Sequence, residues 1–110
     1  AIRVFGARPG LVEREATARE LKSRILLDLG RLDEALREAQ RGRQAFDELL
    51  GPSATSSHLG TAWLAIARVR AARGDAEFAA VAARSALKHL SATLPPAHSQ
   101  RVEALRLTRG

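Results

Sequence analysis

Two segments of this chain follow one pattern: Leu29-Gly30-Arg31-Leu32-Asp33-Glu34-Ala35 and, 44 residues further on, Arg73-Gly74-Asp75-Ala76-Glu77-Phe78-Ala79. A second pair of segments, Leu50-Gly51-Pro52 and Leu94-Pro95-Pro96, has the same spacing. Similarity at a fixed period of this size is typical of proteins built from stacked structural repeats. The sequence therefore predicts a repeat array, an architecture that provides extended surface for binding.

Helical periodicity dominates the chain, and the alternation typical of strands is missing. Glycine, proline and capping residues divide the periodic segments. We expect helices at about residues 11–29, 33–50, 58–73, 75–92 and 98–107. The 110 residues suffice for one compact all-α domain. Because the chain contains no methionine, we interpret it as a piece of a longer protein or one whose start has been removed.

Apolar spacing also predicts how individual helices pack. In the first expected helix, Leu21, Ile25 and Leu29 fall four residues apart and line one face. In the second, Gly42 interrupts an apolar stripe that continues to Phe46. A glycine inside a helix costs about 1 kcal/mol relative to alanine, so Gly42 indicates that another helix passes very close.

Composition excludes several classes of protein. The chain has no cysteine, which rules out disulfides, thiol catalysis and the usual structural zinc site and suits a cytoplasmic location. No apolar run is long enough to suggest a membrane span. The formal net charge is +6, of which +5 falls on residues 51–110. A basic half can attract acidic partners, but nearly all the cations are arginine and alanine is abundant, which GC-rich coding also produces.

The second repeated segment and its surroundings resemble the tetratricopeptide repeat, in the longer-period version found in kinesin light chains. The matching residues are Trp63, Ile66, Ala67, Gly74, Ala79 and Ala86. The resemblance covers about residues 11–92. It implies a right-handed stack of about two and a half antiparallel helix pairs, an α-solenoid.

The first repeat departs from the family pattern. It keeps Gly30, but Arg19 and Lys22 stand where the family has an aromatic and an apolar residue. We expect Leu21 and Ile25 to take over their packing role from a shifted register.

In this family, the inner faces of the first helix of each pair form a concave groove that binds a peptide or a segment of another protein. The resemblance implies a groove lined by Thr17, Glu20, Leu21, Arg24, Leu27 and Asp28 in the first repeat, and by Thr61, Leu64, Ala65, Arg68, Ala71 and Ala72 in the second. The candidate partner-binding residues are Arg24, Leu27, Thr61, Leu64, Arg68 and Ala71. Arg24 and Arg68 are again 44 residues apart and are expected to lie one above the other. Such a pair could grip a carboxylate; the alternative is two solvated arginines on a polar helix face.

The residue types that support catalysis or metal binding do not occur at the sequence spacings that these functions require. His58, His89 and His98 lack ligand-type residues three or four positions further on, so we expect no metal site. The serines at residues 53–57 are interpreted as loop and helix-capping residues. A phosphate-binding loop, a catalytic carboxylate pair and a dinucleotide fingerprint are also missing. We therefore expect neither enzymatic activity nor a cofactor.

The sequence thus predicts a non-catalytic scaffold that binds a protein or peptide, with an acidic or carboxylate-bearing partner suiting the arginines. Two alternatives stay open. The chain could be a spacer or self-association element of a larger regulatory protein, since tetratricopeptide arrays in bacteria often accompany kinase, regulator or protease domains. It could also bind nucleic acid through the cations Arg68, Arg70, Arg73, Arg84, Lys88, Arg101, Arg106 and Arg109, although its four aromatic residues offer few stacking platforms.

Overall fold

The structure, a computed structural model, describes residues 9–51 and 55–109, with side chains from residue 14 onward. Over these ranges the chain forms helices and no strands: α1 (Pro9–Asp28), α2 (Leu32–Leu50), α3 (Ser57–Ala72), α4 (Ala76–Thr93) and α5 (Ser99–Thr108). The all-α prediction is confirmed, and each boundary lies within two residues of the expected one. Ser56 caps α3 by accepting a hydrogen bond from the backbone N–H of His58, whereas Ser53 lies outside the described residues.

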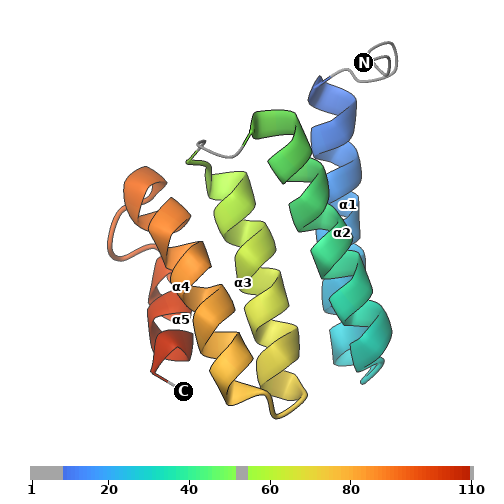
Figure 1. Cartoon of the computed structure of the whole chain (residues 1–110), viewed down its shortest axis with the longest axis vertical. Coiled ribbons are helices and arrows are strands. Elements are labelled where there is room, and N and C mark those ends of the chain that lie inside the picture. The colour runs from blue at the N-terminus through green and yellow to red at the C-terminus, as the bar shows by residue number, and fades with distance from the viewer. Residues whose placement is uncertain (1–8, 52–54, 110) are drawn as a thin grey trace.

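The helices pack in chain order, each against the next (Figure 1). In addition, α3 contacts both α1 and α5, whereas α2 and α4 make no contact with each other within the described ranges. We call the side formed by α1, α3 and α5 the odd-helix side, and the side formed by α2 and α4 the even-helix side. The pair α1–α2 is the first unit, and the pair α3–α4 is the second unit.

The two turns that prompted the repeat hypothesis have the same hydrogen bonds. Gly30 and Gly74 adopt φ values of 78° and 86°, in the left-handed region that favours glycine. At each turn, the glycine N–H bonds the carbonyl oxygen three residues back, at 3.0 Å in both turns. The next N–H bonds the carbonyl five residues back, at 2.8 Å in the first turn and 2.9 Å in the second. This pair of bonds is a Schellman motif, which satisfies the last carbonyls of α1 and α3 and reverses the chain.

The helices of each unit cross closely at one glycine and one alanine. A Cβ atom on Gly42 of α2 would lie 3.4 Å from the carbonyl oxygen of Ala16 on α1, as the sequence predicted for this position. A Cβ atom on Gly60 of α3 would lie 3.3 Å from the carbonyl oxygen of Ala86 on α4. Ala16 and Gly60 are 44 residues apart, and so are Gly42 and Ala86. The two units therefore cross at equivalent points, with glycine and alanine exchanged between the helices.

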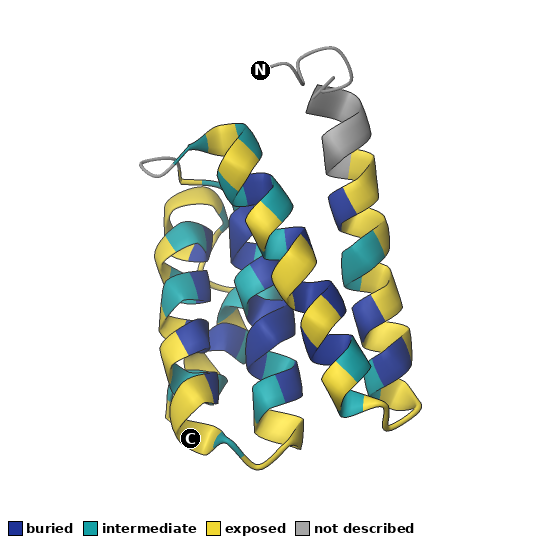
Figure 2. Ribbon diagram, turned by 45° about the vertical axis from the view of Figure 1, so that its right-hand side comes forward, coloured by how far each residue is buried: buried dark blue, intermediate teal, exposed yellow. Residues whose placement is uncertain are grey.

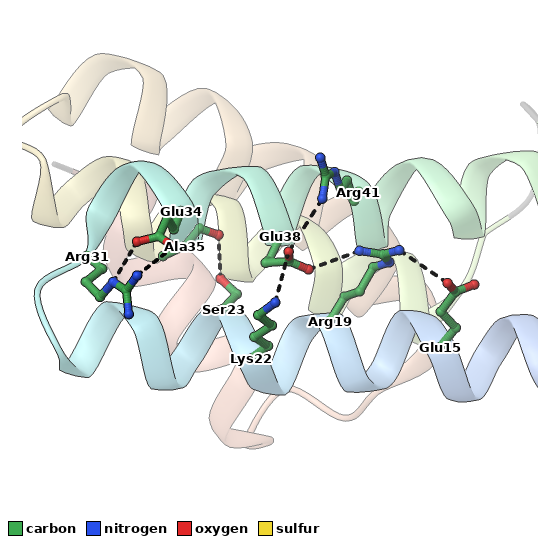
Figure 3. A network of polar contacts seen from close by, with 9 residues as sticks. All are labelled: Glu15, Arg19, Lys22, Ser23, Arg31, Glu34, Ala35, Glu38 and Arg41. Carbon is green, nitrogen blue, oxygen red and sulfur yellow. Dashed lines mark hydrogen bonds and ion pairs between the residues drawn. The ribbon is translucent and has the colours of Figure 1, made fainter.

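An ion network occupies positions at which the first unit differs from the second. Glu38 of α2 is 8% exposed, and its carboxylate lies 3.1 Å from Arg19, 3.6 Å from Lys22 and 3.6 Å from Arg41 (Figure 3). The residues 44 positions after Arg19, Lys22 and Glu38 are Trp63, Ile66 and Ala82. A carboxylate this buried requires charged partners. The first unit thus uses ion pairs between α1 and α2 where the second unit uses apolar packing.

The inward face of α1 also carries a polar contact next to this network. The hydroxyl of Ser23, which is 1% exposed, donates a hydrogen bond of 2.8 Å to the carbonyl oxygen of Ala35 on α2 (Figure 3). Ala16, Ser23 and Leu26 are the buried residues of this helix among those whose side chains are described.

The predicted packing role of Leu21 and Ile25 is wrong. Leu21 and Ile25 do share a face of α1, and Leu29 follows directly after the helix, but the three are 56%, 51% and 65% exposed. Figure 2 shows α1 at the edge of the molecule, with exposed residues along its outer side. The equivalents of Leu21 and Ile25 in the second unit, Ala65 and Val69, are buried in a cluster with residues from α1, α2, α3 and α4. No described helix covers the corresponding face of α1, so the apolar spacing does not produce burial.

None of the described helices combines the length and the apolar character that crossing a membrane requires.

Candidate functional site

An arginine on α3 connects the three helices of the odd-helix side. Arg68 donates two hydrogen bonds to the carboxylate of Glu103 on α5, from Nε at 2.9 Å and from Nη2 at 2.7 Å. Its third nitrogen, Nη1, lies 3.9 Å from Oε2 of Glu20 on α1. The Arg68 side chain is 17% exposed, so these charges interact with less solvent screening than a surface pair would. The bidentate geometry fixes the position of α5 relative to α3.

The electrostatics of this cluster favour the charged form of both partners. The hydrogen bond from Arg68 lowers the pKa of Glu103 and outweighs the effect of burial, which raises it. The positive charges of Arg68, Arg106 and Arg24 lower the pKa of Glu103 further. The same hydrogen bond raises the pKa of Arg68. Glu103 is therefore a carboxylate held among arginines, which is the arrangement that the sequence predicted for a partner's acidic group.

A second contact joins α3 to α5 one to two turns away. The hydroxyl of Thr61 lies 2.9 Å from Oε1 of Gln100 and 2.9 Å from the carbonyl oxygen of Ser57. Thr61 also lines a hollow of about 190 Å³ on the odd-helix side. The hollow is lined by Thr17, Glu20, Phe46, His58, Thr61 and Ala62. The ring of His58 stacks on that of Phe46 at a centroid distance of 5.1 Å, so these two lining residues connect α3 to α2.

The predicted partner-binding residues divide into accessible and inaccessible ones. Arg24 and Ala71 are exposed, and Leu27 and Thr61 are half-buried. Arg68 is held by Glu103. Leu64 is 0% exposed, within a cluster that includes Leu90. Leu64 therefore has no surface to offer a partner, and its assignment to the groove is wrong because it faces α4 and α5.

Glu103 and Gln100 are site residues that sequence reasoning missed. Both lie on α5, beyond the stretch of residues 11–92 that carries the repeat pattern. One signal was present: Glu103 is the sole acidic residue between residues 78 and 110, within a strongly basic segment. An isolated carboxylate among many arginines indicates an ion pair, although the sequence does not say which arginine forms it.

Several cations of the nucleic-acid alternative are engaged within the chain. Besides Arg68, Arg70 and Arg73 form ion pairs with Asp75. Arg73 also lies 3.0 Å from Asp33. The guanidinium of Arg101 donates a hydrogen bond to the carbonyl oxygen of Leu94. Four of the eight cations proposed to bind nucleic acid therefore already have partners within the chain.

Compared with known proteins, the chain matches no family model, no curated protein and no solved structure. The likeness to tetratricopeptide repeats therefore depends on this chain's own residues. Among the residues that the structure describes, no group of three or more His, Cys, Asp or Glu side chains is placed to hold a metal ion.

Proposed function

We propose that the chain is a non-catalytic binding module, built as a tetratricopeptide-like stack of antiparallel helix pairs, that receives an acidic peptide segment on its odd-helix side. The observation that carries this proposal is the internal equivalence of the two units. Both have the same glycine turn and the same glycine–alanine crossing at a spacing of 44 residues. Contacts of α3 with α1 and α5 make one continuous wall of these three helices.

Arg24 is the residue that offers a charge to the partner. Arg68 already uses two of its nitrogens on Glu103, so a partner's carboxylate would have to displace that pair. Arg24 is exposed and lies close enough to lower the pKa of Glu103, which puts it beside this ion pair. The hollow between α1 and α3 next to Thr61 can take a small polar side chain of the same segment.

Selection from a displayed library of random peptides, with the purified chain as bait, tests this proposal. We expect the enriched peptides to contain acidic residues and to bind Arg24→Glu at least about tenfold more weakly than the unmodified chain. Arg84→Glu is the matched control, because Arg84 is an exposed arginine on α4, away from the odd-helix side. If the selected peptides bound equally well to Arg24→Glu and Arg84→Glu, the assignment of Arg24 to the binding site would be wrong.

Self-association is the second candidate function, and the exposed stripe of Leu21 and Ile25 on α1 and Leu29 directly after it favours it. An exposed row of large apolar residues is a common feature of protein contacts. Light scattering of the unmodified chain and of Leu21→Lys/Ile25→Lys decides this question. A mass above that of the monomer, returning to the monomer mass in the variant, is the expected result for self-association.

A further inference from the structure

The even-helix side has a groove of its own between α2 and α4. These two helices both pack against α3 but do not contact each other within the described residues. The space between them holds a hollow of about 360 Å³. Trp63 and Ile66 of α3 line it, together with Gln40 of α2 and with Phe78 and Val81 of α4. The hollow is larger than the one of about 190 Å³ on the odd-helix side.

On α4, which forms one wall of the groove, two large apolar residues are exposed and several small ones are buried, whereas helices usually bury their large apolar residues. The buried residues of this helix are four alanines and Leu90. The two large apolar residues of its first turns, Phe78 and Val81, are instead 61% and 50% exposed. Both line the groove. A helix that buries alanine and exposes phenylalanine and valine has an apolar surface that the described part of the chain leaves largely open.

Two arginines lie over aromatic rings at this groove. The guanidinium of Arg43 lies 4.8 Å from the ring centroid of Trp63, and that of Arg70 lies 5.2 Å from the ring centroid of Phe78. A guanidinium attracted to the face of a ring still has N–H donors that can bond other groups. Ion pairs with Asp47 and Asp75 help to hold the two arginines in place. Neither carboxylate lines the groove, whose charged lining residues are the two arginines.

The first unit provides an internal comparison for these residues. The positions 44 residues before Phe78 and Val81 hold Glu34 and Arg37, ordinary residues of a solvated helix face. Trp63 has Arg19 as its equivalent, and Arg19 is engaged with Glu38. The repeated helix geometry therefore does not require an aromatic floor or an exposed apolar wall. These features belong to the second unit alone.

We infer that this groove is a second binding surface, distinct from the odd-helix side, for an acidic peptide segment that inserts one or two apolar side chains between α2 and α4. The apolar side chains would cover Phe78 and Val81 and contact Trp63. Carboxylates on either side of them would meet the edges of Arg43 and Arg70. Charge complementarity selects this occupant, because the residues that line the groove include two cations and no anion. Each arginine also pairs with a carboxylate outside the lining, Asp47 or Asp75, so the carboxylates of the peptide would share the guanidinium groups with these residues.

The single tryptophan of the chain makes the groove directly observable, since Trp63 lies in its floor. The probes are acetylated, amidated octapeptides with one or two Leu, Ile or Phe residues between Asp or Glu residues. Two control sets replace the apolar residues with Ser, or the acidic residues with Lys. We expect the acidic–apolar peptides to change Trp63 fluorescence saturably, and each control set to bind at least about tenfold more weakly.

Variants then locate the site. Phe78→Ser/Val81→Ser removes the exposed apolar wall without touching a buried residue, and we expect it to weaken peptide binding at least about tenfold. Val102→Ser is the control, since Val102 is 54% exposed on α5, away from the groove. Circular dichroism verifies that the variants remain folded. Arg24→Glu should leave this binding unchanged, so this inference and the proposed function can fail separately.

Three results would overturn the inference. One is that no peptide of the panel changes the fluorescence of Trp63 and none gives a heat of binding in titration calorimetry. Another is that the Ser-substituted peptides bind as tightly as the acidic–apolar peptides. The groove would then attract anions in general, including nucleic acid, and would not recognise apolar side chains. The third is binding that Phe78→Ser/Val81→Ser leaves intact.

Discussion

The tight crossing at Gly60 can be tested by adding one methyl group. A Cβ atom there would lie 2.5 Å from Cδ2 and 2.7 Å from Cγ of Leu90. Leu90 is 0% exposed and packs with Leu64, Ala86 and Ala104, so its side chain has little room to move aside. Overpacking of this kind costs roughly 1–3 kcal/mol, and replacing a helical glycine by alanine returns up to about 1 kcal/mol. Because contacts of 2.5 and 2.7 Å are far inside the normal range, the cost should lie at the upper end, about 2–3 kcal/mol, and we expect Gly60→Ala to lower the free energy of unfolding by about 1–2 kcal/mol.

Gly42→Ala is the matched control for this substitution. Its Cβ atom would lie 3.4 Å from the carbonyl oxygen of Ala16 and 3.8 Å from Cβ of Arg19, which are close to ordinary contacts. The gain in helix propensity then offsets the remaining strain, and we expect a change within about 0.5 kcal/mol. The two glycines thus separate the effect of a steric clash from that of helix propensity.

A double-mutant cycle identifies the clashing atoms. Leu90→Ala alone should cost about 2–5 kcal/mol by creating a cavity. In Gly60→Ala/Leu90→Ala, the added methyl group enters space that the leucine has vacated, so the combined cost should be less than the sum. Urea denaturation monitored by circular dichroism and by Trp63 fluorescence measures each free energy. Gly60→Ala as stable as Gly42→Ala, or costs that add to within about 0.5 kcal/mol, would refute the crossing described above.

Three further predictions concern other parts of the fold. Gly74→Ala forces a side chain into the left-handed conformation, and urea denaturation should show a loss of about 1–2 kcal/mol. The pKa of Glu103 is lower in the folded than in the unfolded chain, so the pair with Arg68 stabilises the fold above pH about 4.5 and loses this effect as the pH falls through the folded pKa. Between pH 7 and pH 3, Glu103→Gln should therefore lose less stability than the unmodified chain, and an equal loss would contradict the ion pair. On α1, Leu26→Ala should cost about 2–5 kcal/mol and Leu21→Ala less than about 0.5 kcal/mol, with similar costs for both indicating that the helix faces are assigned wrongly.

The helix order and the two turns could be predicted because their signals are local. Gly30 and Gly74 each end a periodic segment, and the left-handed conformation that they adopt is one that glycine tolerates best. The close approach at Gly42 could be predicted for the same kind of reason, since a glycine inside an otherwise favourable helix needs a packing explanation.

The faces of α1 could not be assigned by the same reasoning. Spacing shows that Leu21 and Ile25 share a face, but it does not show whether another helix covers that face. Their equivalents Ala65 and Val69 are buried because α3 has neighbouring helices on several sides, including both α2 and α4. The pair of Arg68 and Glu103 was equally out of reach, because it depends on where α5 docks and joins residues 35 positions apart.

The exchange of glycine and alanine at the two crossings has a consequence for how such chains diverge. At each crossing one alanine faces one glycine, and the alanine comes from opposite helices: Ala16 of α1 against Gly42, and Ala86 of α4 against Gly60. What the two crossings have in common is the summed side-chain volume of the two facing residues. The residue type at each single position differs between the units. A position-by-position alignment counts two mismatches where the interhelical spacing is the same, so units can lose recognisable similarity without losing geometry. Replacing Ala16 by Gly together with Gly42 by Ala should accordingly leave the first unit nearly as stable as it is.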